Sequence, residues 1–434
     1  MTEPNEYETA VNLLAGVLQH GKPLIFRDQR HVAPLDTQKR DPTPLCKQIC
    51  YGVLRDYYRL TFYRDSLVTR KLPSKQADLE ILLLCGIYSI CSLKRPAHTS
   101  VNATVQTTRH LNKAWASGFI NGVLRNFIRR RNDLEKRADE STETRWNHPE
   151  WLQKSLRCAW PEDAENIMVA NNDPAPMTLR INLQKTDIAR YQQQLMSSGL
   201  KSTPIAGAPS ALQLHTAVSV DRLPGFSDGF ASVQDEASQL VAPLLSLEPG
   251  DKVLDACAAP GGKTCHLLEI EPEIRLQAVD VDPERIRYLD DNLRRLGLNC
   301  DTVSGNFLDY ENGLFNKILL DVPCSATGII RRHPDIKLLR NSADIDKLSD
   351  IQTELLNHAW KHLETGGLLI YSTCSVLPQE NEQLVYQFVQ SRKDVIVLPV
   401  DSVRGNALKS GRQLLPQLQG HDGFYMARLR KVVP

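Results

Sequence analysis

Two cysteines, each directly after a predicted buried strand, are the residues best suited to covalent chemistry. Cys324 lies in the segment DVPCSATG and Cys374 in YSTCS, and Asp321 stands three residues before the first cysteine. A buried cysteine is ordinarily inert packing, but two thiols at neighbouring strand ends beside an acid favour a shared chemical role. Their spacing alone ranks the two cysteines equally as nucleophiles.

A glycine-containing loop, DACAAPGGKT at residues 255–264, lies between another predicted strand and its helix. Small residues let backbone N–H groups approach a ligand at the positive end of a helix. Two interpretations compete with an ordinary tight turn. GGKT is typical of a phosphate-binding loop, with Asp321 near magnesium and Cys257 in the place of the first glycine. Alternatively, the loop wraps the methionine part of S-adenosylmethionine.

Asp280 helps to distinguish these interpretations. It ends a predicted strand 25 residues after Asp255, at a place where an acid accepts hydrogen bonds from both ribose hydroxyls of a nucleoside cofactor. Asp282, directly before Pro283, is the better candidate for capping the next helix, which leaves Asp280 free for a ligand. Asp280 therefore favours a site for S-adenosylmethionine.

A thiolate beside this cofactor suits methyl transfer to a carbon atom that is a poor nucleophile. Addition of the thiolate to C6 of cytosine makes C5 enamine-like, so that C5 attacks the methyl group, and loss of the C5 proton then allows release of the enzyme. An acid at Asp321, touching the N3 or N4 edge of the base, would stabilise charge on the ring. The base must leave any helical stack to react, which favours a single strand, a loop or a flipped base.

Alternating strands and helices from residue 236 onward position these segments. Strands are predicted at 252–256, 276–280, 301–304, 317–321 and 368–372, with two late strands near Ile396 and Tyr425. The alternation predicts a mostly parallel sheet with helices on both faces. Ligands of such sheets bind at the carboxyl ends of the strands. We therefore expect a doubly wound α/β domain over residues 236–434.

The upstream sequence has a different pattern. Apolar residues recur at helical spacing through the first 131 residues without strand-like alternation, which predicts an all-α bundle over residues 1–135. Residues 132–145 are charged and poor in apolar side chains, as expected of a linker. Mixed helix and strand patterns over residues 146–235 predict a small α+β domain.

Charge is distributed unevenly along the 434 residues, although 52 basic and 51 acidic side chains give a net charge of only +1. Residues 1–131 carry 20 Lys and Arg against 10 Asp and Glu, a net +10, and the remainder carries 32 against 41, a net −9. The basic part indicates contact with a polyanion. It includes an arginine-rich helix end, formed by Arg125, Arg129, Arg130 and Arg131. Because the remainder is acidic, we expect a local basic path beside the site through Arg331 and Arg332.

Several classes of protein are disfavoured. None of the ten cysteines forms a CxxC pair, so we expect no metal site. The N-terminus lacks the pattern of a signal peptide, and the longest apolar stretch, at residues 81–90, is about half a membrane span. We therefore expect a cytoplasmic protein with free thiols and no membrane partner. A monomer is a separate expectation.

Four segments together resemble the RNA cytosine-5 methyltransferases: DACAAPGGKT, AVDVD, DVPCSATG and YSTCSVLPQENE. Their order and spacing, through IIRRHPDIK at residues 329–337, are similar to the bacterial 16S ribosomal RNA methyltransferase B family, also called the Sun or Fmu type. CYGVLR at 50–55 and INGVLR at 120–125 resemble the helical fold of the antitermination factor NusB, the N-terminal module of that family. The resemblance covers nearly the whole chain.

The resemblance implies a NusB-like RNA-binding bundle, a small α+β domain and a C-terminal Rossmann-like class I methyltransferase domain. It also implies methyl transfer from S-adenosylmethionine to C5 of one cytosine of 16S ribosomal RNA, cytosine 967 by the resemblance, through a covalent bond between cysteine and C6. Under this resemblance Cys374 is the nucleophile, Cys324 assists release of the methylated product, and Asp321 is the third catalytic residue.

The resemblance further implies a set of cofactor contacts. They are Cys257, Ala258, Ala259, Pro260, Gly261, Gly262, Lys263, Asp280, Asn306 and Asp321. The family usually has an aspartate in the segment where this chain has Asn306. An asparagine still presents a carbonyl oxygen to the adenine amino group, but without the charge.

The residues alone leave two other classes of function open. A nucleotide hydrolase would use GGKT and Asp321. A non-catalytic RNA-binding or assembly factor would work through the basic helical domain, although the presence of both Cys324 and Cys374 argues against it.

Overall fold

The structure, a computed structural model, describes residues 5–26, 42–70, 72–311 and 313–433. The chain forms two compact units: Met1–Asp173 with Ile330–Asn341, and Pro174–Ile329 with Ser342–Pro434. The first four residues, part of the stretch used to argue against a signal peptide, lie outside the described residues. Among the described helices, none combines the length and apolar character needed to cross a membrane.

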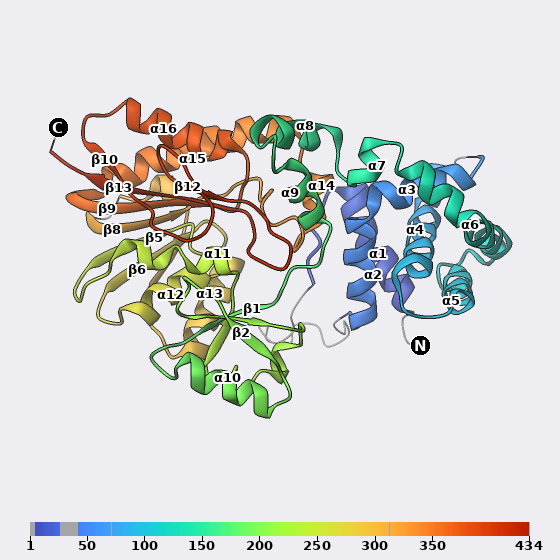
Figure 1. Ribbon diagram of the computed structural model, residues 1–434, viewed down its shortest axis with the longest axis horizontal. Coiled ribbons are helices and arrows are strands. Elements are labelled where there is room, and N and C mark those ends of the chain that lie inside the picture. Colours follow the sequence, from blue (N-terminus) through green and yellow to red (C-terminus); the bar gives the residue numbers. More distant parts are fainter. Residues whose placement is uncertain (1–4, 27–41, 71, 312, 434) are drawn as a thin grey trace. The chain divides into compact units, whose positions relative to one another are not determined.

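The first unit is helical throughout its described residues. Its helices are α1 (Glu6–His20), α2 (Pro44–Arg55), α3 (Tyr57–Leu67), α4 (Ala77–Ser92), α5 (Ala97–His110), α6 (Ser117–Ala138), α7 (Thr142–Trp146), α8 (Glu150–Ala159), α9 (Ala164–Asn171) and the short α14 (Ile336–Leu339). Every residue of α4 from Ile81 to Ile90 is buried. A helix that is apolar on all sides must be covered on all sides, so α4 lies at the centre of the bundle (Figure 1).

The linker predicted over residues 132–145 is wrong for most of its length. α6 continues to Ala138, and α7 begins at Thr142. Leu134 and Ala138 are fully buried four residues apart, so one narrow apolar stripe fixes a helix whose other faces are charged. Composition alone hides such a stripe, because polar residues dominate the count.

The segment Ile330–Asn341 interrupts the sequence of the second unit but packs in the first. The Lys337 ammonium is 1% exposed and donates to the carbonyl oxygens of Arg55 (2.6 Å) and Asn147 (2.8 Å) and to the side chain of Asn172 (3.1 Å). These three oxygens match the three donors of an ammonium group. Burial lowers the pKa of Lys337 to about 7. The Asp335 carboxylate also accepts the backbone N–H of Leu24 at 3.0 Å.

This packing corrects the expectation of a basic path through Arg331 and Arg332. Arg331 is only 1% exposed, and its carbonyl oxygen accepts a hydrogen bond from Arg55 at 3.1 Å. Arg332 is partly exposed. The prediction is therefore wrong for Arg331, because the segment that carries it belongs to the interior of the helical unit.

The second unit begins with a four-stranded antiparallel sheet. Its strands are β1 (Thr178–Ile181), β2 (Ser202–Pro204), β3 (Ala211–Leu214) and β4 (Ala231–Val233), in the order β2-β3-β1-β4. The helix α10 (Ile188–Ser197) contributes Tyr191 and Leu195 to an apolar core with Leu179, Ile181 and Leu212 of this sheet. The predicted strand at residues 178–182 thus corresponds to β1, one of the two inner strands of this sheet.

A nine-stranded sheet follows. Its strands are β5 (Lys252–Ala256), β6 (Arg275–Asp280), β7 (Asp301–Ser304), β8 (Phe315–Asp321), β9 (Leu363–Thr373), β10 (Val395–Leu398), β11 (Asn406–Ala407), β12 (Arg412–Leu414) and β13 (Phe424–Lys431). Its helices are α11 (Glu236–Gln239), α12 (Gly262–Ile270), α13 (Pro283–Leu296), α15 (Ser342–Lys361) and α16 (Glu382–Gln390). The order is β11-β12-β13-β9-β8-β5-β6-β7, with β10 on β13, and β5 to β9 are mutually parallel.

Apolar side chains leave the central strands alternately toward two cores. Leu254, Ile318 and Tyr371 face the core shared with α15 and α16, whereas Val253 and Leu319 face the core shared with α12 and α13. Figure 1 shows these helix pairs on opposite faces of the sheet. Burial on both faces explains why the central strands are nearly continuous apolar runs, and the expected doubly wound α/β architecture is confirmed.

Replacing Lys337 with methionine is expected to destabilise the helical unit. Three oxygen acceptors would lose their shared donor, and buried unsatisfied acceptors cost about 1–3 kcal/mol each before relaxation. Thermal unfolding should therefore shift to lower temperature. Lys347→Met, at an exposed position of α15, is the matched control. Equal unfolding midpoints for the two variants would contradict a structural role for Lys337.

Candidate functional site

The site lies where the strand order of the large sheet changes direction. β5 pairs in parallel with β6 on one side and with β8 on the other. The connections after β5 and β8 therefore diverge at the carboxyl edge of the sheet and leave a crevice, the usual ligand position in such folds. Asp321 ends β8, and Ser372 on β9 lies opposite it in the ladder. The sequence-predicted catalytic residues thus come together at one edge.

The two predicted thiols face each other. The sulfur atoms of Cys324 and Cys374 are 3.4 Å apart, and Cys374 is the more exposed of the two. The hydrogen bond that the Cys324 thiol makes to the Cys374 sulfur, reinforced by burial, raises the pKa of Cys324 well above its ordinary value. Cys324 is therefore a protonated thiol at neutral pH. Among the described residues, all ten cysteines are free thiols.

Gly328 allows this approach of the two cysteine loops. Its backbone N–H donates to the carbonyl oxygen of Cys374 at 2.9 Å, and its own carbonyl accepts from Gly423 at 2.9 Å. A Cβ atom at this position would clash with the carbonyl oxygens of both Gly423 and Cys374. The glycine of DVPCSATG is thus required by close backbone contact.

Asp321 is fixed by partners on both sides. Lys263 donates to one of its oxygens at 2.7 Å, and Ser372 donates to the other at 2.7 Å. Burial lowers the pKa of Lys263, but the charge of Asp321 and the hydrogen bond to it outweigh burial and raise it. A phosphate-binding loop needs its lysine for a phosphate, whereas this lysine pairs directly with the acid expected near magnesium. Among the described residues, no group of three His, Cys, Asp or Glu side chains is arranged to hold a metal ion.

The predicted cofactor loop folds back over the sheet edge. Cys257 has φ 64° and Gly261 has φ 91°, both in the left-handed region. A Cβ atom on Gly261 would lie 2.8 Å from Cγ of Leu289 on α13, so only glycine fits there. Burial, with the charges of Asp280 and Asp321, raises the pKa of Cys257 to about 12. Cys257 is therefore a neutral loop residue and not a thiolate.

Asp280 and Asp282 both accept backbone hydrogen bonds from the segments around the end of β6. The Asp282 side chain accepts the backbone N–H of Glu284 at 2.9 Å, which confirms it as the cap of α13. Asp280 accepts the N–H groups of Ala259 (2.9 Å) and Asp282 (3.0 Å). The expectation that Asp280 is free is therefore wrong, because it braces the cofactor loop. A carboxylate has about four acceptor positions, so two remain.

A cavity of about 400 Å³ adjoins the ends of β6 and β7. It is lined by Val279, Val303, Gly305, Asn306, Asp309, Tyr310 and Glu311. This volume is within the range of small-molecule sites, and the valines offer an apolar surface to a flat ring. The side-chain amide oxygen of Asn306 accepts the backbone N–H of Leu308 at 3.2 Å, so part of the acceptor capacity of this side chain caps the turn that follows.

Sequence reasoning missed Asp255 as a functional candidate. Its side chain is fully buried at the end of β5, where one oxygen accepts the Thr264 hydroxyl at 2.6 Å. The other oxygen has no hydrogen-bond partner among the described residues. Burial raises the pKa of Asp255 to about 7. An acid inside an apolar strand, directly before the glycine loop, was the available signal.

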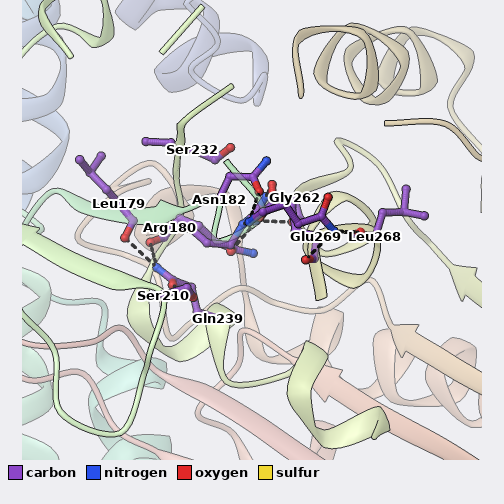
Figure 2. Close-up of polar contacts among 12 residues, drawn as sticks. Leu179, Arg180, Asn182, Ser210, Ser232, Gln239, Gly262, Leu268 and Glu269 are labelled. Carbon is purple, nitrogen blue, oxygen red and sulfur yellow. Dashed lines mark hydrogen bonds and ion pairs between the residues drawn. The ribbon is translucent and has the colours of Figure 1, made fainter. Parts of the chain in front are cut away.

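Arg180 was also missed, although it is tied to both ends of α12 (Figure 2). It is 1% exposed on β1, forms a two-pronged ion pair with Glu269 at 2.7 and 2.8 Å, and donates to the carbonyl oxygen of Gly262 at 2.6 Å. Gln234 accepts a further hydrogen bond at 2.7 Å. The planar guanidinium supplies all these bonds at once, so the small sheet holds the helix that follows the cofactor loop. The signal was an arginine within the apolar strand TLRIN.

The arginine-rich end of α6 is only partly available to a polyanion. Arg125 and Arg129 are exposed. Two arginines instead form ion pairs within the helix, Arg130 with Asp133 at 3.4 Å and Arg131 with Glu135 at 2.8 Å. The predicted basic surface on this helix therefore depends mainly on the first two arginines.

Asp255→Asn is expected to stabilise the free protein above pH 7. The raised pKa means that the folded state favours the neutral acid, so the contribution of Asp255 to stability is lost as pH rises from about 4 to about 7. Asparagine is neutral throughout. Denaturant unfolding should show a gain of about 1–4 kcal/mol at pH 8.5 and a smaller one at pH 5.5. The control Asp346→Asn, exposed on α15, should change little. A stability gain of Asp255→Asn that becomes smaller as the pH rises would contradict a raised pKa of Asp255.

Comparison with known proteins accounts for all three parts of the chain. The family described as 16S rRNA methyltransferase RsmB/F matches residues 242–430, the ferredoxin-like domain of RsmF/B-like methyltransferases matches 148–221, and the NusB family matches 5–129. A solved methyltransferase homolog protein from Pyrococcus horikoshii has 30% identity and a TM-score of 0.60, covering 67% of this chain and 97% of its own.

Curated relatives extend the similarity over most of the length. A probable ribosomal RNA small subunit methyltransferase B of Coxiella burnetii is 41% identical over 407 residues, which is 92% of this chain and 94% of the relative. The ribosomal RNA small subunit methyltransferase B of Vibrio cholerae is 42% identical over 391 residues, 89% of each chain. The nucleotide-hydrolase interpretation has no support in these relatives, and the chain belongs to the ribosomal RNA small subunit methyltransferase B family.

Proposed function

We propose that this protein transfers a methyl group from S-adenosylmethionine to C5 of a cytosine in 16S ribosomal RNA, with cytosine 967 as the target. One observation carries the proposal: two thiols 3.4 Å apart stand beside an anchored acid at the carboxyl edge of the sheet. Methyl transfer to a nitrogen or oxygen atom needs no thiol, whereas transfer to C5 needs covalent activation of the ring. The names of the relatives support ribosomal RNA as the substrate.

The residues at the crevice fit S-adenosylmethionine. The loop from Cys257 to Lys263 would hold the methionine part, and the unpartnered oxygen of Asp255 beneath it suits a ligand that brings a donor. Asp280 has acceptor capacity for the ribose, and the cavity at Asn306 suits the adenine. When bound, the cofactor supplies an electrophilic methyl group on a sulfonium centre.

Cys374 is the proposed nucleophile because it is the more exposed thiol. Its thiolate forms a bond to C6 of cytosine, and the electron pair of the C5–C6 double bond moves toward the N3 side of the ring. Asp321, held by Lys263 and Ser372, accepts a hydrogen bond from the N4 amino group of the base and so fixes the ring for attack. C5 then has the electron pair it needs to accept the methyl group.

Cys324 is the proposed base for product release. The hydrogen bond with Cys374 is the largest cause of its raised pKa in the free protein, and this bond is lost once the Cys374 sulfur is bonded to C6. Loss of this bond removes the largest cause of the raised pKa, so Cys324 releases its own proton to solvent and, as a thiolate, then takes the proton from C5. Those C–H electrons restore the double bond as the C6–S bond breaks, and the electron pair returns to the Cys374 sulfur.

The basic helical domain is proposed to dock the RNA. Its net charge of +10 over residues 1–131 and the exposed Arg125 and Arg129 support salt-dependent phosphate contacts. We also propose that the protein works as a cytoplasmic monomer. The domain limits at 1–135, 146–235 and 236–434 stay predictions.

Alanine substitutions of the two cysteines are expected to block the reaction at different steps. Cys374→Ala should reduce methyl transfer to background, because no bond to C6 can form. Cys324→Ala should instead accumulate a covalent RNA–protein adduct that survives a denaturing gel. The assay uses 16S ribosomal RNA from cells lacking this protein, and bisulfite mapping identifies the methylated position. Cys158→Ala, at an exposed cysteine, is the control. Near-normal turnover by Cys374→Ala would overturn the nucleophile assignment.

Arg180→Lys is expected to weaken cofactor binding more than turnover. One ammonium cannot replace the two-pronged bond to Glu269 together with the bond to Gly262, so α12 and the loop before it should shift. Calorimetric titration should show affinity for S-adenosylhomocysteine reduced by about tenfold, equivalent to about 1.4 kcal/mol. Arg190→Lys, exposed on α10, should bind normally. A lowered melting temperature with unchanged affinity would mean that Arg180 only stabilises the fold.

A further inference from the structure

Glu380 is a fully buried acid whose function the reaction scheme leaves unexplained. It ends the short 3-10 turn Pro378–Glu380, directly after the Cys374 loop, and its exposure is 0%. Burying a carboxylate is unfavourable unless strong donors replace water. The identity of those donors therefore indicates what this acid does.

Each oxygen of the Glu380 carboxylate accepts two hydrogen bonds. Oε1 accepts the backbone N–H of Ser325 at 2.7 Å and the side-chain amide of Gln352 at 3.0 Å. Oε2 accepts the hydroxyls of Ser325 at 2.5 Å and Ser375 at 2.6 Å. An acceptor-only pattern of this kind is that of an ionised carboxylate, and charge-assisted bonds are the stronger kind.

These donors come from the two loops that carry the thiols. Ser325 directly follows Cys324, and Ser375 directly follows Cys374. Gln352 adds a second link to the first loop, because its amide also donates to the Pro323 carbonyl at 2.9 Å. One buried charge therefore joins backbone segments that are 50 residues apart, the separation of the two cysteines.

The backbone of Glu380 is itself held in place. The carbonyl oxygen of Glu380 accepts the Tyr371 hydroxyl at 2.7 Å, and Tyr371 is fully buried on β9. The carboxylate therefore has a fixed position relative to the sheet edge, so that the loops are positioned relative to the sheet and not only to each other.

We propose that Glu380 is a positioning residue that sets the separation and direction of the two thiols through Ser325 and Ser375. This inference rests on the proposed function for its catalytic consequence, but its geometric content is independent of it. Both sulfur atoms must reach one pyrimidine ring, Cys374 at C6 and Cys324 near C5. The Glu380 carboxylate holds that arrangement because its oxygens accept hydrogen bonds from both loops. An apolar residue at this position could accept none.

The test compares Glu380→Gln with Glu382→Gln. Glu382 lies two residues further on and accepts the N–H of Ser410 at 2.9 Å and the Tyr425 hydroxyl at 3.1 Å. It is therefore a matched carboxylate whose hydrogen bonds to Ser410 and Tyr425 lie outside the thiol loops. The first readout is geometric. The azo oxidant diamide takes two hydrogens from a pair of thiols to form a disulfide and a hydrazine, and peptide mapping measures the rate of linking Cys324 to Cys374. Glu380→Gln should slow linking by about tenfold, and Glu382→Gln should link at the wild-type rate.

The second readout is kinetic. Misplacement of reacting groups by about 1 Å costs about 100-fold in rate, so Glu380→Gln should lower kcat by about this factor while KM for RNA and for S-adenosylmethionine changes less than about threefold. Should Glu380→Gln fail to fold, the double variant Ser325→Ala with Ser375→Ala replaces it and should slow linking in the same direction. Wild-type linking and wild-type kcat in these variants would overturn the proposal.

The outcomes separate the two ideas. Slowed linking in Glu380→Gln, together with normal turnover by Cys374→Ala, would reject the proposed reaction and retain Glu380 as the residue that positions the thiols. Loss of turnover in Cys374→Ala, together with unchanged linking and turnover in Glu380→Gln, would retain the reaction and reject the positioning role.

Discussion

The parallel pairing of β5 with β8 is the constraint on which the site depends. Because β6 and β7 extend the sheet on the other side of β5, the chain must cross back before β8, and the connections on either side diverge at one edge. The pairing registers bring Ala256 next to Leu320 and Asp321 next to Ser372. The glycine loop and both thiol loops begin at that edge, so their proximity is a property of the topology and not of local sequence.

Charged side chains, most of them buried, then fix the loops that the topology brings together. Arg180 with Glu269 ties the small sheet to α12, Lys263 with Asp321 joins the cofactor loop to the thiol edge, and Glu380 joins the thiol loops. Such groups are weak sources of stability, because desolvation offsets most of their attraction. Their directional bonds nonetheless define positions more sharply than apolar packing does.

The sequence carries enough information for the topology and for most of the site, but not for the residues that support it. β5 coincides with its prediction at 252–256, because a strand buried on both faces is an apolar run with polar ends. β9 begins at Leu363, five residues before the predicted start, since the two glycines before Leu368 resemble a turn. α15 begins at Ser342, and polar residues dominate its first turns, so apolar periodicity gives little sign of where this helix starts.

The side chains that position the site were not predictable in the same way. Glu380 and Ser325 are 55 residues apart, and Arg180 and Glu269 are 89 residues apart. A lone acid or arginine in a sequence carries no sign of such a distant partner. The same limit produced the error at Asp280, whose partner Ala259 lies in another loop, and at Arg331, whose segment packs in the helical unit.

The placement of Ile330–Asn341 in the helical unit also has a consequence for the order of events during synthesis. A ribosome delivers the N-terminal residues first, and domains generally begin to fold as they emerge. This unit, however, lacks the ammonium that fills the space between Arg55, Asn147 and Asn172 until residue 337 has been translated. Although it stands first in the chain, it is completed only after β5 to β8 have been made. The helical unit, although translated first, can therefore reach its final packing only late in synthesis. By then the residues of β5 to β8 have already been translated.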